Sequence, residues 1–331
     1  MKIEDIAREA GVSKGTVSKI INGYPNISEE LRKKVNEIIK KNNFVPNNSA
    51  RNLAGKKNKV IGLFIYDKGE LKTSAFFQSF VGIAVDEAEK KGYSVLLSII
   101  KSDEMFEKVK NFYDSGVING AIVIGMKSNI KELDAIIEND YKIALIDYLD
   151  VCLNKNTILI NSNNSFGGRL AADYLVKKGC KDLLHISGDL DKFAGKERVK
   201  GFEEFCLQNN IKYKILEASF NGFLSKNILK KYLEKNKTLP DGIFCANDET
   251  AINIIEYLKE SNINISQSLK IIGFDNVDLS TYISPKLTTI DIDLKTMAIK
   301  TIEYLTEKIE DKNNKKIYKY ESEIELIERE S

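Results

Sequence analysis

Apolar residues follow two different patterns along the chain. Up to residue 41 they recur three or four positions apart, whereas from residue 60 they form short continuous runs such as VIGLFIY, separated by amphipathic stretches. The first pattern predicts short helices with one buried face. The second predicts buried parallel strands that alternate with helices. The chain therefore divides into a helical N-terminal part and a larger α/β part.

The N-terminal part is predicted to contain three short helices. Residues 3–10 place apolar side chains on one helical face, and Gly11 suits the end of that helix. Ser13 can cap a second helix, and a third helix follows the N-cap candidate Ser28. Two helices joined by a tight turn and covered by a third form a helix-turn-helix module, whose second helix enters the DNA major groove.

The predicted second helix carries a glycine on its polar face. Within GVSKGTVSKIINGY (11–24), Val17, Ile20 and Ile21 share one face, and the opposite face is small, polar and basic. A glycine in an exposed helical turn is about 1 kcal/mol less favourable than alanine, so close approach of another molecule explains it better than solvent does. The alternative is that this face is only the solvent-exposed side of a small helical bundle. The predicted reading face comprises Gly15, Ser18, Lys19 and Asn22, with Thr16 also suited to base or phosphate contacts.

Charge is spread unevenly over the two parts. The whole chain has a net charge of +2, yet residues 1–59 hold 13 Lys and Arg against 6 Asp and Glu. A basic head on a mildly acidic body indicates that the head meets a polyanion.

Several classes of protein find little support in the residues. No apolar run approaches the roughly 20 residues of a membrane span, and MKIEDIAREAG lacks the form of a signal peptide. The four cysteines show no CxxC pairing and His185 is the single histidine. We therefore expect a cytoplasmic protein with reduced thiols, no metal site, no cofactor and no membrane partner.

The α/β part contains two successive arrays of strands and helices. The strands of the first are VIGLFIY, YSVLLSII, GAIVIG and KIALID, with helices through Glu89 and near 103–115 and 130–139. Those of the second, after residue 161, are DLLHIS, YKILEA, GIFCAN and LKIIGF. Such arrays predict two parallel sheets covered by helices. Ligands of these folds bind beyond the carboxyl ends of the strands, so the cleft between the lobes is the expected site.

A polar stretch connects the two parts. NNSARNLAGKKNK follows Pro46 and contains a nascent helix that is too short to be stable alone in water. Leu53 is predicted to act as a wedge between base steps in a minor groove, or alternatively to pack on a neighbouring domain. The expected boundaries are a head at 1–46, a hinge helix and linker at 47–59, and a core at 60–331. Within the core, lobe 1 covers about 60–160 and 291–320, and lobe 2 covers about 161–290 and the C-terminal strand.

Several stretches resemble the lactose/galactose-repressor (LacI/GalR) family of bacterial transcriptional regulators. They are IEDIAREAGVSKGTVSKIINGY, FVPNNSARNLAGKKNKVIGLFI, LKIIGFDNVDLSTYISPKLTTI and the tail ELIERES, and the likeness runs along essentially the whole chain. It implies an all-α helix-turn-helix headpiece and a periplasmic-binding-protein-like α/β core of two parallel-sheet lobes. It also implies a homodimer or tetramer on a pseudo-palindromic double-stranded DNA operator, and a small-molecule effector, expected to be a carbohydrate. The DNA contacts implied are Lys14, Gly15, Ser18 and Lys19 for specificity, Thr16 and Asn22 for phosphate, and Asn48, Arg51 and Leu53 in the hinge.

The same resemblance assigns effector contacts in the core. Polar groups at strand ends suit a polyhydroxylated ligand, and aromatic rings suit its apolar faces. Each carboxylate has an alternative role as a cap or an ion-pair partner. The family often has aspartate where Ser162 stands and glutamine where Ile292 stands, which leaves the identity of the effector open. The implied contacts are Phe76, Phe77, Asp147, Arg198, Phe220, Asn247, Asp248 and Asp275.

Two other functional classes compete with a regulator. A sugar-binding transport protein without a DNA function would share the two-lobed core but would have no use for residues 1–53. An enzyme is not expected, because GxxxxGK[ST], GxSxG and clustered metal ligands are missing from the sequence. The residues distinguish neither a dimer from a tetramer nor an inducer from a corepressor.

Overall fold

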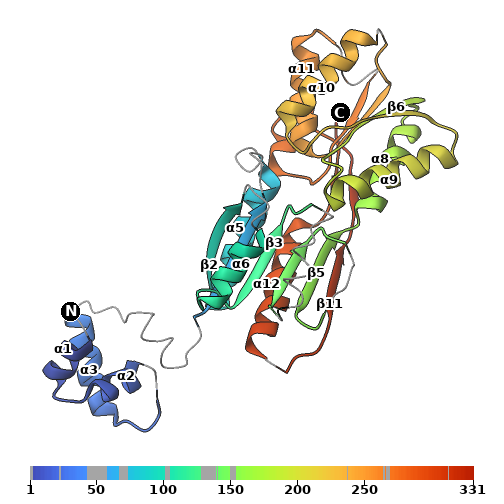
Figure 1. Cartoon of the computed structure of the whole chain (residues 1–331). Helices are drawn as coiled ribbons and strands as arrows, with labels where there is room; N and C mark the ends of the chain where they lie inside the picture. The colour runs from blue at the N-terminus through green and yellow to red at the C-terminus, as the bar shows by residue number, and fades with distance from the viewer. Residues whose placement is uncertain are drawn as a thin grey trace. The chain divides into compact units, whose positions relative to one another are not determined.

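The structure, a computed structural model, divides into two compact units, residues 1–58 and 59–331 (Figure 1). Most of the expected hinge, together with Asn22, Asn48, Arg51 and Leu53, lies outside the described residues, as does most of the helix expected near 130–139. The structure describes residues 3–21, 24–42, 58–66, 74–100, 105–127, 139, 141–149, 154–236, 238–263, 265, 269–311 and 313–331.

The first unit consists of the three predicted helices, α1 (Ile3–Ala10), α2 (Lys14–Ile21) and α3 (Glu29–Lys41). Gly11 follows α1 with a left-handed φ of 71°, which glycine adopts without strain. The Ser28 hydroxyl caps α3 by accepting a hydrogen bond from the Leu31 amide at 3.4 Å. The helices close on a small apolar core made of Ile6, Ala7, Ala10, Val17, Ile20, Val35 and Ile38.

Lobe 1 of the second unit is built on a parallel six-stranded sheet. Residues alternate between the faces of this sheet, so Leu63 joins the cluster under α5 and α12 while Phe64 joins the cluster under α6. The strands, in the order β11-β5-β4-β3-β1-β2, and their helices are β11 (Tyr318–Ser322), β5 (Thr157–Ser162), β4 (Ile143–Ile146), β3 (Gly120–Ile124), β1 (Val60–Tyr66), β2 (Ser94–Ile100), α5 (Ala75–Lys90), α6 (Met105–Asp114) and α12 (Leu294–Glu310).

Lobe 2 contains a second parallel sheet, in the order β7-β6-β8-β9, and a short antiparallel pair, β10 with β12. Helices α8 and α9 lie side by side in Figure 1 and pack closely, because a Cβ at Gly201 would lie 1.8 Å from the Ser165 carbonyl oxygen. The elements are α8 (Asn164–Lys177), β6 (Asp182–Ile186), α9 (Phe193–Gln208), β7 (Lys212–Leu216), α10 (Gly222–Lys235), β8 (Gly242–Cys245), α11 (Asp248–Glu260), β9 (Lys270–Ile272), the 3-10 helix η1 (Asp278–Thr281), β10 (Thr289–Asp291) and β12 (Glu325–Ile327).

The chain crosses between the lobes at 162–164, 291–294 and 322–325. The first crossing follows β5, which pairs with β4 and extends to Ser162. The other two crossings bring α12 and β11 back to lobe 1, where β11 pairs with β5 across more than 150 residues of sequence. The cleft between the lobes therefore lies at the carboxyl ends of the strands.

Three of the four cysteines lie among the described residues. Cys180, Cys206 and Cys245 are free and buried, and Cys152 lies outside the described residues. Within the described ranges, no helix is both long and apolar enough to cross a bilayer.

Candidate functional site

The polar face of α2 is open to solvent, whereas Val17 and Ile20 on its other face are buried. Lys14 and Lys19 are exposed, and the ammonium of Lys14 lies 2.5 Å from the carboxylate of Glu4. An exposed ion pair of this kind contributes about 0–1 kcal/mol, so Lys14 can exchange Glu4 for a phosphate or a base at little cost. Of the predicted DNA contacts on this helix, Gly15 is exposed, and Thr16 and Ser18 are half-buried.

No described residue of the head requires glycine at position 15. Its backbone is in an α-helix and not in the left-handed region. A Cβ added there would meet only the Ser13 hydroxyl, at 3.6 Å, which is an ordinary van der Waals contact. Among the described residues of the head, none therefore fills the space above Gly15.

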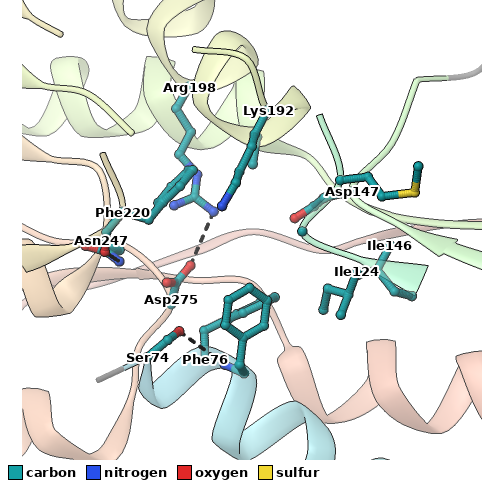
Figure 2. Close-up of a pocket in the computed structure, with 14 residues that line it drawn as sticks. Ser74, Phe76, Ile124, Ile146, Asp147, Lys192, Arg198, Phe220, Asn247 and Asp275 are labelled. Atoms are coloured by element: carbon teal, nitrogen blue, oxygen red, sulfur yellow. Dashed lines mark hydrogen bonds and ion pairs between the residues drawn. The ribbon is translucent and has the colours of Figure 1, made fainter. Parts of the chain in front are cut away.

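A cavity with about 600 Å³ of empty space, part of it open solvent, lies between the lobes of the second unit. Figure 2 shows Arg198 and Lys192 extending from lobe 2 toward Asp275, with the ring of Phe76 on the opposite side. The cavity is lined by Ser74, Phe76, Phe77, Ile124, Gly125, Met126, Ile146, Asp147, Lys192, Ala194, Arg198, Phe220, Asn247 and Asp275, which include all the predicted effector contacts except Asp248.

Arg198 is buried, and its guanidinium is held by several groups of the protein. Nε donates to the side-chain oxygen of Asn164 at 2.8 Å, Nη1 donates to the Ala246 carbonyl, and Nη2 lies 3.3 Å from Asp275. Its Cζ atom also lies 3.6 Å from the centroid of the Phe274 ring. Burial lowers the pKa of Arg198, and Asp275 counteracts this effect. The remaining N–H groups are thus held in a fixed orientation beside the cavity.

Asp147 follows β4 in a left-handed conformation, with φ 48°, that directs its carboxylate to the crossing between the lobes. The carboxylate accepts hydrogen bonds from the Ser162 amide at 2.8 Å, the Ser162 hydroxyl at 2.9 Å and the Asn164 amide group at 3.0 Å. Burial raises the pKa of Asp147, while Ser162 and Arg198 lower it. An aspartate at 162 would repel Asp147, whereas serine supplies donors, so this departure from the family pattern is compatible with the site.

Asp275 also follows a strand and also has a positive φ, 101°. Strained backbone of this type occurs preferentially at functional sites. Burial raises the pKa of Asp275 to about 7, although the neighbouring Arg198 acts to lower it. Near neutral pH this carboxyl group can therefore serve either as a donor or as an acceptor.

Aromatic rings form the apolar walls of the cavity. Phe76 and Phe77 meet edge to face, with centroids 5.5 Å apart. The Phe220 ring lies 5.4 Å from the guanidinium of Arg198 and 5.6 Å from the ammonium of Lys192. Gly188 supports this ring, because a Cβ there would lie 2.3 Å from a Phe220 carbon.

Asp248 is not among the residues that line the cavity, and its assignment as an effector contact stays a prediction. Its side chain is fully buried and accepts hydrogen bonds from the Thr289 hydroxyl at 2.5 Å and the Val277 amide at 2.9 Å. These contacts hold the loop after β9 in place. Burial and the negative charge of Asp275 raise the pKa of Asp248 well above its usual value.

Asn247 lines the cavity and is largely occupied by contacts within the protein. Its amide nitrogen donates to the Phe220 carbonyl and to Glu249, both at 3.0 Å. Its side-chain oxygen caps α11 by accepting from the Thr250 amide at 3.0 Å. Asn247 therefore builds the wall of the site.

Sequence reasoning missed Lys192, which is 9% exposed and immediately precedes α9. Lysine in a polar loop is typical of a solvated surface, so its residue type carried no signal. The position of Lys192 in the chain did indicate a role, because its loop follows β6 at the carboxyl edge of the sheet. Ile292, which stands where the family often has glutamine, is fully buried in an apolar cluster and is not among the residues that line the cavity.

The site is a concave space with aromatic walls, two cations, two carboxyl groups and an amide. It can exchange hydrogen bonds with a ligand that carries several hydroxyl groups and apolar ring faces. Among the described residues no cluster of His, Cys, Asp or Glu has the arrangement of a metal site.

Comparison with known proteins places both units. Residues 2–47 match the family described as "Bacterial regulatory proteins, lacI family", and residues 172–331 match the "Periplasmic binding protein-like domain". The chain is similar to the HTH-type transcriptional repressor PurR of Histophilus somni, with 30% identity over 317 residues, covering 94% of this chain and 92% of the relative. It is also similar to the ribose operon repressor of Halalkalibacterium halodurans, with 29% identity over 332 residues, covering 99% of this chain and 96% of the relative.

Solved structures share the fold. The lac repressor dimer bound to operator and the anti-inducer ONPF has a TM-score of 0.86 and 22% identity, covering 100% of this chain and 98% of that chain. The complex of the transcriptional regulator CelR with cellobiose has a TM-score of 0.75 and 21% identity, covering 100% of this chain and 99% of that chain. The helix-turn-helix head, the two-lobed core and the similarity to repressors along the whole chain lead to one conclusion: this protein belongs to the LacI family of bacterial regulatory proteins.

Proposed function

We propose that this protein is a transcriptional repressor that binds a pseudo-palindromic DNA operator as a homodimer and responds to a small molecule in the cleft of its core. Its relatives along almost the full length are named as repressors. This function requires binding and no catalytic step. It implies that the protein acts in the cytoplasm, on DNA.

The observation that carries the proposal is the open polar face of α2. Gly15 leaves space above the helix that no described residue of the head fills, and Lys14 and Lys19 flank that space. Lysine donors match the acceptor atoms of guanine in the major groove. We assign base recognition to Lys14, Gly15, Ser18 and Lys19, phosphate contacts to Thr16 and Asn22, and minor-groove and hinge contacts to Asn48, Arg51 and Leu53.

For the effector we propose a carbohydrate that contacts both lobes. Phe76, Phe77 and Asp147 belong to lobe 1, whereas Arg198, Phe220 and Asp275 belong to lobe 2. A ligand that touches both sets favours one arrangement of the lobes, and it shifts DNA binding only as far as it prefers that arrangement. The names of two similar proteins mention ribose and cellobiose, which is consistent with this class.

For the dimer contact we propose the edge of lobe 1 formed by β2. Leu97 and Ile99 on this strand are 46% and 41% exposed. An apolar edge strand invites pairing or coverage by another chain. A second copy of the chain satisfies this requirement and presents two heads to a symmetric site.

A decisive experiment selects binding sites for the full-length protein from random duplex DNA. We expect a two-fold symmetric sequence, with affinity that falls steeply as salt rises because phosphate contacts release counterions. The variant Leu53→Ala should weaken binding to the selected site while sparing binding to random DNA.

The sugar-binding transport protein without a DNA function makes a different prediction. Deletion of residues 1–58 would leave every binding activity intact in that case, whereas a repressor loses DNA binding and retains ligand binding. Failure to enrich any symmetric site would refute the proposal.

A further inference from the structure

Glu249 forms a contact between the two lobes that the cleft residues do not account for. It lies in the first turn of α11 in lobe 2 and is 8% exposed. Its Oε1 accepts a hydrogen bond from the backbone amide of Ala75, the first residue of α5 in lobe 1. Amides in the first turn of a helix have no acceptor within the helix, so an acceptor from outside must satisfy them when they are buried.

The acceptor suits this position electrostatically. The N-terminus of a helix carries a partial positive charge, which a carboxylate complements. A hydrogen bond from an amide to a charged oxygen is also stronger than one to a neutral oxygen. Glu249 thus attracts the end of α5 toward lobe 2.

Asn247 connects this contact to the cavity. Its amide nitrogen donates to Oε2 of Glu249 at 3.0 Å, while Oε1 faces Ala75. Because Asn247 itself lines the cavity, the same side chain belongs to the wall of the site and orients the carboxylate behind it.

The end of α5 that Glu249 holds is also a wall of the site. Ser74 caps α5 by accepting from the Phe77 amide at 3.3 Å, and Ser74, Phe76 and Phe77 all line the cavity. Moving the first turn of α5 away from lobe 2 would therefore move the aromatic wall relative to Arg198 and Asp275.

We propose that Glu249 is a positioning residue of the cleft, which fastens the aromatic wall on α5 to lobe 2 through the Ala75 amide. The assignment rests on contacts within the core. It holds in the absence of ligand and DNA, so its test is independent of the proposed function.

The test is residue-resolved hydrogen exchange on the full-length protein without ligand or DNA. The Ala75 amide is the reporter, because its acceptor in this structure is Glu249. The Gln78 amide, bonded to the Ser74 carbonyl at 3.1 Å within the helix, reports on α5 itself. Glu256→Ala is the matched control, since it removes a glutamate from the exposed face of the same helix.

We expect Glu249→Ala to accelerate exchange at Ala75 about tenfold or more, as loss of a charge-assisted hydrogen bond implies. Gln78 and the amides of β1 should change far less, Glu249→Gln should fall between the wild type and the alanine variant, and Glu256→Ala should match the wild type. Unchanged exchange at Ala75 in Glu249→Ala, or equal acceleration at Ala75, Gln78 and β1, would overturn the proposal. If the alanine variant does not fold, Glu249→Gln decides by the same comparison, and wild-type exchange at Ala75 would then reject the assignment.

Discussion

Replacing Gly15 by alanine separates stability of the head from its function. Among the described residues, the added Cβ meets only the Ser13 hydroxyl, at 3.6 Å, and the site is exposed and helical, so these residues accommodate it without strain. Alanine lowers the conformational entropy of the unfolded chain relative to glycine. The full gain in a helix interior is about 1 kcal/mol, and about half of that is expected here because Gly15 lies in the first turn.

In a unit of this size, about 0.5 kcal/mol raises the melting temperature by roughly 2–4 °C. The same methyl group extends into the space that DNA is proposed to enter. We expect affinity for the selected operator to fall about tenfold or more, which corresponds to at least about 1.4 kcal/mol.

Two assays measure these opposite effects. Thermal unfolding of the 1–58 unit followed by circular dichroism gives the change in stability, and fluorescence anisotropy with the full chain at fixed salt gives operator affinity. Gly82→Ala is the control for the affinity assay with the full chain, because Gly82 is an exposed glycine within α5 of the core with nothing within 4 Å of an added Cβ. A less stable head in Gly15→Ala, or wild-type operator affinity, would refute the reasoning.

Three further predictions concern the cleft. Arg198→Ala should lower the free energy of unfolding of the core, measured by urea titration, by about 3 kcal/mol or more, because it leaves Asp275 buried without its counter-ion. The double variant with Asp275→Asn should recover part of this loss. The folded pKa of Asp275, about 7, exceeds its unfolded value of 3.8. The folded state therefore binds more protons between these values, and this contribution to stability should decline as pH rises from 4 to 7. Asp275→Asn should abolish that component, and an unchanged pH dependence of the urea midpoint would contradict it. Gly188→Ala should displace the Phe220 ring, since the added Cβ would lie 2.3 Å from it. The rise in melting temperature that a sugar produces in the wild type should therefore be smaller in this variant. An equal rise in both proteins would show that this ring does not contact the sugar.

Local patterns were sufficient to predict most of the architecture. Helical spacing predicted α1, α2 and α3, and continuous apolar runs predicted the strands β1 to β4 and β6 to β9. These features depend on neighbours close in sequence, through periodic burial and capping. The parallel arrays also placed polar residues such as Asp147, Asn247 and Asp275 at one edge of each sheet, because parallel strands end on the same side.

Pairing between distant segments was decided by the tertiary structure. β11 pairs with β5 across more than 150 residues, and β10 pairs with β12. Short strands of this kind carry little pattern of their own, and the partner that covers them sets their position.

The roles of adjacent residues also required the fold. Asn247 faces the cavity and Asp248 faces the loop after β9, although they are neighbours in the sequence. Lys192 and Glu249 resemble ordinary surface residues until the opposite lobe is in place. The sequence by itself thus determined the family, the two-part organisation and the edge of the sheets at which the site lies. Only the tertiary structure decided which side chains face the cavity, because that depends on the backbone direction at each strand end and on groups brought together from the other lobe.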